Sequence, residues 1–309
     1  MSMTPGRHIV ITGASSFIGV HLTNAFLAAG DKVVAVCRAS SKSKFAQNPN
    51  LTIVEATMQD YGTLAQQIPA ADVFIHLAWM GTGHDGRDEQ ELQAENVTCS
   101  LQALQAAREM RCRLFVDAGS QAEYGIVTTT ISETTLCHPF SEYGKAKLRF
   151  RGEAAQRCQE WGMKYIHCRI FSLIGEDDHP WTLVMTCVQK MLQHEPIALS
   201  ACTQHWNFLY VKDAAQQIRR LCDYALSADA FRAETFNIAS EDTRVLRDFV
   251  LSMQQLTHSK SVLQFGAVTP AHVVTLQPDV SKVREAIGFI SSVSFDDVVR
   301  SIISENINR

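Results

Sequence analysis

Apolar runs of strand length alternate with longer stretches of helical spacing along most of the chain. The apolar runs occupy residues 8–12, 32–37, 51–54, 72–78, 113–118 and 164–171. Helical spacing appears between them at 18–29, 60–68, 89–110 and 141–161, with Gly30 closing the first helix and Asp60 placed to cap the second. Because strands that alternate with helices form βαβ units, the pattern predicts a doubly wound α/β fold with a parallel sheet covered on both faces.

The alternation of strands and helices breaks after residue 171. Gly, Asp and Pro gather at 175–180, and a helix at 181–193 and an apolar strand at 206–211 follow. Residues 212–225 and 235–239 then predict one more helix and strand that return to the sheet. We therefore expect a Rossmann-type domain of residues 1–172 and 212–240, and a smaller, discontinuous substrate-binding region of residues 173–211 and 241–309.

Composition narrows the class of protein. Hydrophobic residues make up 46% of the 309 residues, which is enough for a large core. No apolar run reaches membrane-spanning length and the start has no signal-peptide stretch, so we expect a cytoplasmic protein without a membrane partner. The net charge of −4, with scattered Lys and Arg, argues against nucleic acid as a partner. The nine cysteines form no C-x-x-C pair and predict reduced, buried thiols, with no disulfide and no metal site.

A glycine-containing turn follows the first strand, with the sequence TGASSFIG at residues 12–19. Gly13 and Gly19 allow a sharp turn, and the helix that starts there directs its free N–H groups and positive dipole end at a pyrophosphate. Ser16 stands where a middle glycine is expected. The turn predicts a dinucleotide cofactor for the Rossmann-type domain; a tight β-α turn without a ligand is the alternative.

The end of the second strand bears on the choice of cofactor. An acidic residue there favours NAD because it binds the ribose 2′-hydroxyl, whereas an arginine accommodates the extra phosphate of NADP. This chain has Cys37 followed by Arg38. We therefore favour NADP(H) over NAD(H), which stays possible because Arg38 could instead be a solvated loop charge.

Three polar residues form a candidate catalytic group downstream of the turn. Tyr143 and Lys147 are four residues apart, so on a helix both side chains emerge from one face, where the ammonium can poise the phenol for proton exchange. Ser120 ends the fifth strand, at the carboxyl edge where α/β sheets bind ligands, and its hydroxyl can bind a substrate oxygen. Together with the glycine turn, these residues predict a redox enzyme that moves a hydride and a proton.

Several further motifs accompany this group. They are HLA at 76–78, NV at 96–97, GSQAEYG at 119–125, YGKAK at 143–147, RIFS at 169–172, FLYVKD at 208–213 and FNIA at 236–239. With them, nearly the whole chain resembles an extended short-chain dehydrogenase/reductase of the nucleotide-sugar epimerase, dehydratase and ketoreductase group.

The resemblance implies a role for each matched position. It implies that Ser120 orients the reacting oxygen, that Tyr143 is the acid/base, and that Lys147 binds the nicotinamide ribose and lowers the pKa of the tyrosine, with Asn96 in support of the active-site helix. The implied cofactor-binding residues are Gly13, Ser15, Ser16, Phe17, Ile18, Gly19, Arg38, Thr57, Met58, Leu77, Ala78, Lys147 and Phe171. The implied substrate-binding residues are Trp79, Gln121, Ser172 and Trp206.

Members of this group are often dimers through a four-helix bundle. The resemblance therefore implies a homodimer interface on the helices at 89–110 and 141–161. The apolar faces of these helices are equally consistent with ordinary core packing.

The chain departs from the family pattern in three places. Dehydratases of the group carry an Asp-Glu pair directly after the catalytic Ser or Thr, but this chain has Gln121 and Ala122, which disfavours dehydration. The Asp that usually contacts adenine appears as Thr57, and an Arg usual near the nucleotide phosphates appears as Trp206. These departures predict unusual nucleotide recognition.

A glycine-rich segment at 79–87 follows the fourth strand and is predicted to overhang the active site. Trp79 could stack on a sugar face there, and His84 or Arg87 could meet a phosphate. The alternatives are a buried indole and solvated charges.

Three functions remain open at this point. The first is an NADP(H)-dependent reductase of a nucleotide-linked 4-keto-6-deoxy sugar, with hydride transfer to C4 and Tyr143 as proton donor. The second is an NAD-dependent nucleotide-sugar 4-epimerase with the same residues. The third is a non-catalytic dinucleotide-binding regulator, which the retention of Ser120, Tyr143 and Lys147 argues against.

Overall fold

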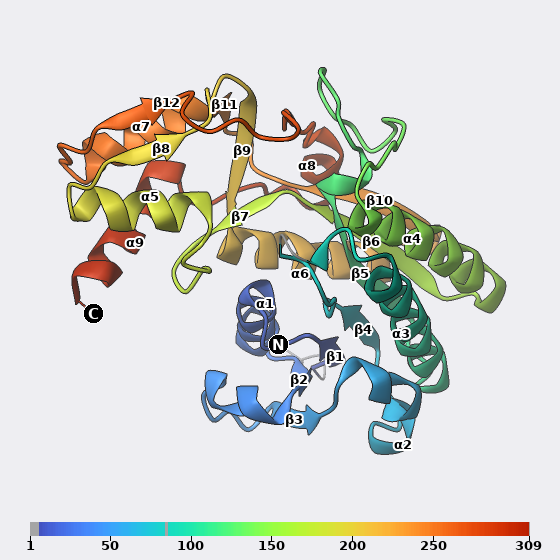
Figure 1. Ribbon diagram of the computed structural model, residues 1–309. Coiled ribbons are helices and arrows are strands. Elements are labelled where there is room, and N and C mark those ends of the chain that lie inside the picture. The colour runs from blue at the N-terminus through green and yellow to red at the C-terminus, as the bar shows by residue number, and fades with distance from the viewer. Residues whose placement is uncertain (1–5, 84–85, 309) are drawn as a thin grey trace.

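The computed structural model describes residues 6–83 and 86–308 and is built around one parallel sheet of seven strands (Figure 1). Every neighbouring pair in that sheet runs parallel. The order across the sheet is β10 (Ala233–Ile238), β6 (Lys164–Ile170), β5 (Leu114–Ser120), β4 (Val73–His76), β1 (His8–Thr12), β2 (Lys32–Cys37) and β3 (Leu51–Glu55). The chain therefore moves outward from β1 in both directions, which confirms the predicted doubly wound fold.

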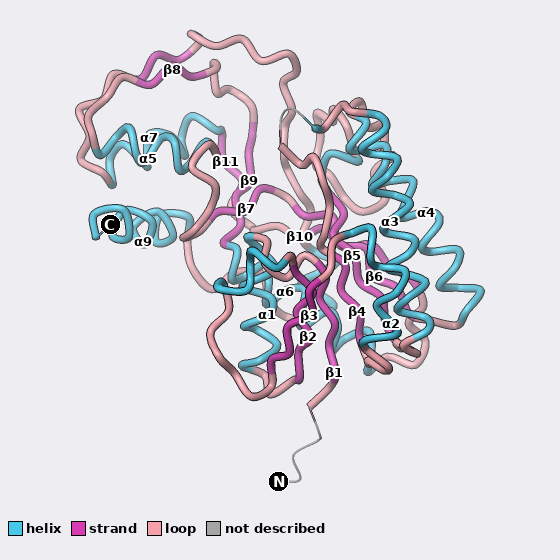
Figure 2. The backbone as a smooth tube through the Cα atoms, turned by 60° about the horizontal axis from the view of Figure 1, so that its bottom comes forward, coloured by secondary structure: helices cyan, strands magenta, loops and turns pink. Residues whose placement is uncertain are grey.

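Helices cover both faces of the sheet, as Figures 1 and 2 show. On one face lie α1 (Phe17–Ala28), α6 (Val211–Ser227) and α8 (Ser281–Ile287), which share one apolar core with the strands. On the other lie α3 (Gln90–Glu109), α4 (Glu142–Trp161), η2 (Met58–Thr63) and α2 (Leu64–Gln67), with a second core. Strands buried on both faces explain the near-continuous apolar runs in the sequence.

The remaining elements build a separate lobe with a third apolar core (Figure 1). Its strands are β7 (Ser172–Ile174), β9 (His205–Tyr210) and β11 (Thr243–Val245) in one sheet, and β8 (Ile197–Leu199) and β12 (Leu263–Phe265) in another. Its helices are α5 (Leu183–Leu192), α7 (Leu246–Leu256) and α9 (Phe295–Asn308). The chain enters this lobe directly after β6, crosses back through α6 and β10, and returns to it at β11.

One local prediction is wrong. Asp60 does not cap a helix at 60–68, because Thr57 caps a 3-10 turn that begins at Met58, and the α-helical part spans only Leu64–Gln67. The Asp60 carboxylate accepts hydrogen bonds from the Thr57 backbone N–H at 2.8 Å and from its hydroxyl at 2.7 Å. The capping residue and its reciprocal partner were therefore exchanged in the sequence interpretation.

The other long elements match their predicted positions within a few residues. Gly30 follows α1 with φ of +87°, the left-handed conformation expected of a glycine that ends a helix. The sequence pattern did not reveal the three-residue strands of the smaller lobe, because so short a strand carries too little alternation. Within the described residues, no helix is both long and apolar enough to cross a membrane.

Candidate active site

The turn between β1 and α1 has the geometry of a phosphate-binding loop. Gly13 has φ of +67°, and a Cβ atom there would lie 2.7 Å from the backbone nitrogen of Ala78, two residues after β4. At Gly19 a Cβ atom would lie 2.4 Å from the carbonyl oxygen of Gly13. Ser16 is the N-cap of α1, and its hydroxyl accepts the N–H of Gly19 at 3.1 Å. Ser16 therefore begins the helix by capping, so the first turn can present its N–H groups without a middle glycine.

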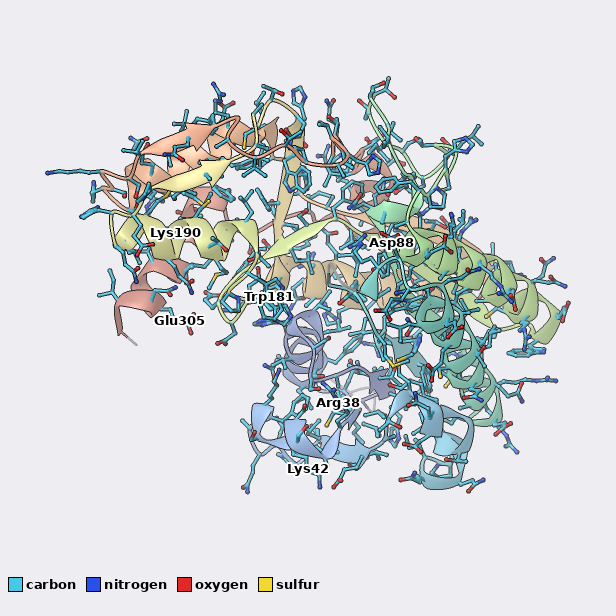
Figure 3. The ribbon with its side chains drawn as sticks, in the orientation of Figure 1. Arg38, Lys42, Asp88, Trp181, Lys190 and Glu305 are labelled. Carbon is cyan, nitrogen blue, oxygen red and sulfur yellow. The ribbon has the colours of Figure 1, made fainter. Side chains whose placement is uncertain are left out.

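The edge beside this turn carries several cations. Arg38 directly follows β2 and is exposed; Figure 3 shows it on the same side of the molecule as Lys42. Lys42 pairs with Glu55 at the end of β3, and the Lys44 ammonium donates to the carbonyl oxygen of Ser15 at 2.9 Å. The end of β2 thus presents a guanidinium where NAD-selective sites carry a carboxylate.

The two residues expected next to the adenine lie after β3. Thr57 is exposed and its hydroxyl is bonded to Asp60, whereas Met58 is buried in the core below α3. Met58 is therefore held in place by the core rather than free to adapt to a ligand.

The segment after β4 is fixed by Asn96 on α3. Leu77 is buried, Ala78 lies against the glycine turn, and the N–H and the carbonyl of Met80 both bond to the fully buried Asn96 side chain. The Met80 N–H donates to Asn96 Oδ1 at 2.8 Å, and Asn96 Nδ2 donates to the Met80 carbonyl at 2.9 Å. Asn96 thus holds the start of the loop that carries Trp79.

Ser120, Tyr143 and Lys147 come together at the carboxyl edge of the sheet. Ser120 is the last residue of β5, and Tyr143 and Lys147 lie on the first turns of α4, which begins with Ser141 as its N-cap. All three are buried, at 9%, 8% and 4% exposure. The Lys147 ammonium donates to the carbonyl oxygen of Ala118 at 2.6 Å. The helix therefore brings its two side chains against the end of β5, as the i, i+4 spacing predicted.

Burial and the neighbouring carboxylates have opposite effects on the pKa of Lys147. Burial lowers the pKa of the Lys147 ammonium to about 8, while Asp117 and Glu123 act in the opposite direction. Lys147 is therefore predominantly protonated at neutral pH and loses its charge in mildly alkaline solution.

The phenol of Tyr143 is surrounded by aromatic and cationic groups. The Arg87 guanidinium lies 4.4 Å from the centre of its ring, and the Trp79 ring meets it edge-on at 6.2 Å between centroids. Burial raises the pKa of Tyr143, whereas a hydrogen bond with Ser120 and the charge of Arg87 lower it. In this state the phenol keeps its proton at neutral pH.

The indole of Trp79 covers the ammonium of Lys147. The Lys147 nitrogen lies 3.6 Å from the centre of the Trp79 ring, and the indole N–H donates to Gln93 at 2.8 Å. The backbone N–H of Tyr143 donates to the Arg87 carbonyl at 2.8 Å, and neighbouring Asp88 lies near the start of α4 (Figure 3). The segment after β4 is thereby joined to α4 at both of its ends. His84, a predicted phosphate contact, lies outside the described residues.

The other predicted contacts are spread around this group. Phe171 is buried against Tyr124 and the sheet, Ser172 begins β7, and Gln121 is half-buried in η4 (Gln121–Glu123) directly after Ser120. Trp206 lies on β9 in the smaller lobe, where its buried indole nitrogen has no hydrogen-bond partner within the described part of the chain. Trp206 packs against the core beside α1 and α6 and against the core of the smaller lobe, whereas Ser120 and Tyr143 lie at the end of β5 and the start of α4.

Sequence interpretation missed a charged group directly beneath Ser120. Glu123 is fully buried and interacts with His167 and Arg169 of β6, and His167 also meets Asp117 of β5. Charged residues at 117, 167 and 169 interrupt strands that are otherwise apolar. That interruption was the available signal, because a charge in a buried strand requires a partner.

The parallel sheet, the glycine turn and the Ser-Tyr-Lys group together define the class of Rossmann-type nicotinamide enzymes. The model of the NAD dependent epimerase/dehydratase family matches residues 9–239. The chain belongs to this family. Its homologues are NAD-dependent enzymes of the extended short-chain dehydrogenase/reductase type.

Individual relatives are distant. The chain is 24% identical over 303 residues to a UDP-glucose epimerase of Bacillus subtilis described as uncharacterized, covering 94% of each chain. It is 25% identical over 218 residues to the dTDP-6-deoxy-L-talose 4-dehydrogenase (NAD(+)) of Aggregatibacter actinomycetemcomitans, covering 68% of this chain and 78% of that one. The structure resembles that of UDP-glucuronic acid 4-epimerase from Bacillus cereus in complex with NAD, with a TM-score of 0.82 at 20% identity over 96% of this chain and 99% of that one.

The residues of the turn fit a nicotinamide dinucleotide. Because Gly13 and Gly19 lack a Cβ atom, the backbone of the turn packs closely against Ala78 and against the first turn of α1, whose N-terminus is a positive dipole end. A bound dinucleotide would be held by the first-turn N–H groups of α1, with Arg38 beside its adenosine end.

Proposed function

We propose that the protein is a 4-epimerase of a nucleotide-linked sugar that works with a retained NAD. The observation that carries this proposal is the convergence of Ser120, Tyr143 and Lys147 at the carboxyl edge of the sheet, where only β4 separates β5 from the strand β1 that leads into the glycine turn. The name of the Bacillus subtilis relative supports epimerisation, and the name of the Bacillus cereus structural neighbour supports C4 as its position.

Tyr143 exchanges the proton with the C4 oxygen of the sugar. The Ser120 hydroxyl binds the C4 oxygen and holds it near the phenol. Tyr143 takes the proton of the C4 hydroxyl and returns it to the same oxygen after the 4-keto sugar has turned to present its other face. Lys147 stabilises the phenolate by its positive charge and holds the ribose of the dinucleotide. The bound dinucleotide supplies the acceptor and donor of the hydride.

Epimerisation suits this site better than dehydration does. Elimination of water needs an acid and a base beside Ser120, but Gln121 and Ala122 offer neither. Glu123 follows them, but its carboxylate is fully buried and occupied by His167 and Arg169. The site thus has groups for removing and returning a proton at one oxygen.

A second candidate is a reductase of a nucleotide-linked 4-keto-6-deoxy sugar that consumes NADPH. The exposed guanidinium of Arg38 favours it, because an arginine at the end of β2 can pair with the 2′-phosphate of NADP. The name of the Aggregatibacter relative, a 4-dehydrogenase of a 6-deoxy sugar nucleotide, describes the same kind of conversion. In this reaction Tyr143 donates its proton once and no second hydride transfer follows.

Cofactor consumption separates the two functions. Purified protein is incubated with UDP-, GDP-, CDP- and dTDP-linked hexoses and with their 4-keto-6-deoxy derivatives, while absorbance at the nicotinamide band and the product are followed by spectroscopy and NMR. An epimerase forms the C4 epimer with no net absorbance change, whereas a reductase depletes NADPH stoichiometrically. The Tyr143→Phe variant should lose about a hundredfold or more of either activity. Full activity in that variant would refute the assignment of Tyr143.

Cofactor selection is tested by titration without a sugar. If Arg38 binds the 2′-phosphate, the wild type binds NADPH more tightly than NADH. The Arg38→Ala variant should then weaken NADPH binding by about tenfold or more, which removes the difference between the two cofactors. Lys32→Ala, which removes an exposed cation at the start of the same strand, is the matched control. Equal affinities of the wild type for the two cofactors would exclude this role of Arg38.

We also propose a homodimer through the outer faces of α3 and α4. The apolar residues of both helices point into the core, and charged side chains such as Arg149 and Glu153 occupy the outer face of α4. A dimer here would therefore be held by polar contacts around the half-buried Leu101 and Ala155. Sedimentation equilibrium of the wild type and of Ala155→Glu tests it: a monomeric wild type, or a dimer that the variant leaves intact, contradicts this interface.

A further inference from the structure

Four charged side chains form a buried cluster directly beneath the Ser120 end of β5. Asp117 and Glu123 contribute carboxylates, and His167 and Arg169 contribute the cations, all at 2% exposure or less. His167 Nδ1 lies 3.1 Å from both oxygens of Asp117, and its Nε2 lies 3.0 and 2.9 Å from the two oxygens of Glu123. Arg169 Nε donates to Glu123 at 2.9 Å. The cluster thus contains two negative and two positive groups in contact.

The histidine of this cluster is a cation. Each of its ring nitrogens faces a carboxylate, and only a doubly protonated imidazole can donate on both sides. The carboxylates outweigh the effect of burial and raise the pKa of His167 to about 9. The Tyr165 hydroxyl also donates to Asp117 at 2.7 Å. Every strong acceptor of the cluster is therefore occupied at neutral pH.

The cluster is connected to the candidate active site through the last residues of β5. Glu123 Oε1 accepts the backbone N–H of Ser120 at 2.7 Å, and the carbonyl of Ala118 accepts the Lys147 ammonium. Between them, Gly119 has no side chain, and a Cβ atom there would lie 2.3 Å from His167 Nε2. The cluster consequently approaches the backbone of the end of β5, which carries Ser120 and accepts the hydrogen bond of Lys147.

Lys147 responds to the charges of the cluster. The negative charges of Asp117 on β5 and Glu123 in η4 both raise the pKa of Lys147 and so favour its ammonium form. From β4 it faces His76, whose pKa is lowered by burial to about 3, so that this ring is neutral. On its remaining side lie the Trp79 ring and the Tyr143 ring, beside Arg87. Asp117 and Glu123 are thus the anions that oppose the loss of its proton.

We infer that Asp117 and Glu123, held by His167, form the positioning unit of the hydride-transfer site: Glu123 fixes the Ser120 amide, and both carboxylates keep Lys147 in its ammonium form. This inference rests on the proposed function, in which Ser120 binds the sugar oxygen and Lys147 the ribose. Stability alone does not account for the cluster, because apolar residues of similar volume stabilise a core at least as well as buried ion pairs do. The cluster binds the Ser120 amide and places negative charge near Lys147, and apolar residues could do neither.

The test uses two isosteric variants that each remove one negative charge, Glu123→Gln and Asp117→Asn. The glutamine oxygen can still accept the Ser120 N–H, and Asp117→Asn does not touch Ser120 at all. Glu153→Gln removes an exposed charge from α4 and is the matched control. In each protein the affinity for NADH is measured by fluorescence between pH 6 and 10, and kcat and KM for the nucleotide sugar are measured over the same range.

The wild type should lose NADH affinity with a midpoint near the pKa of Lys147, about 8. Both cluster variants should shift that midpoint, and the alkaline limb of kcat, to lower pH by roughly one unit, whereas Glu153→Gln should not. Unshifted midpoints in either variant, with thermal unfolding showing a folded protein, overturn the inference. Because the binding midpoint is measured without a sugar, failure of the turnover assay alone refutes the proposed function and leaves this result standing.

Discussion

The glycine at the start of the dinucleotide turn yields a sharp test of the fold and the site together. Gly13 is left-handed, with φ of +67°, and a Cβ atom at this position would lie 2.7 Å from the Ala78 nitrogen and 2.9 Å from its Cα. Both are backbone atoms of the segment that directly follows β4, beside the centre of the sheet. They cannot move aside as a flexible side chain does, so Gly13→Ala must displace β1 from β4 or deform the turn.

The cost can be divided into two contributions. The left-handed backbone costs an alanine about 1–2 kcal/mol, and forcing an extra carbon into packed surroundings costs about 1–3 kcal/mol more. Gly30 supplies the matched control, since it has φ of +87° and a Cβ atom there would meet nothing within 4 Å. We expect Gly30→Ala to lose about 1–2 kcal/mol and Gly13→Ala about 2–5 kcal/mol of the free energy of unfolding.

Urea unfolding of both variants at one pH, without nucleotide, measures these values, and NADH fluorescence measures the affinity of the folded fraction. Gly13→Ala should also weaken NADH binding, because the turn and the first N–H groups of α1 shift, whereas Gly30→Ala at the far end of α1 should leave it unchanged. If the two variants were equally stable and bound NADH equally well, the close approach of β1 to β4 would have no energetic consequence and the reasoning would be wrong.

Three further predictions concern the capping serine, the loop anchor and the buried histidine. Ser16→Ala should destabilise the protein by about 1 kcal/mol and weaken NADH binding, as measured by urea unfolding and fluorescence, because Gly19 loses its cap. Asn96→Ala should cost about 1–3 kcal/mol and raise KM, because the Met80 backbone loses both partners; an unchanged KM would contradict the anchoring role. Since its pKa is raised from 6.5 to about 9, His167 stabilises the fold fully below pH 6.5 and loses this contribution as pH rises through 9. The stability advantage of the wild type over His167→Gln in urea should therefore shrink across that window, and a constant difference would exclude a charged His167.

Much of the main domain followed from the sequence. Apolar runs that are buried on both faces predict a parallel sheet, and the turn at 12–19 predicts the edge at which it binds its ligand. The Tyr143 and Lys147 pair was equally accessible, because helical spacing alone places two residues four apart on one face. Such local periodicities depend only on neighbours in the sequence.

The surroundings of these residues depended on contacts between distant segments. Trp79 was predicted only as a possible sugar contact, and its position over Lys147, about seventy residues later in the chain, arises from the packing of the segment after β4 against α4. Asp117, Glu123 and His167 come from β5, η4 and β6, and nothing in the spacing of their sequence positions shows that they meet. The sequence determined which elements form and which faces they bury, through local periodicity. The register of β5 against β6 decided which charges meet beneath Ser120, because side chains on parallel strands become neighbours only once the sheet has assembled.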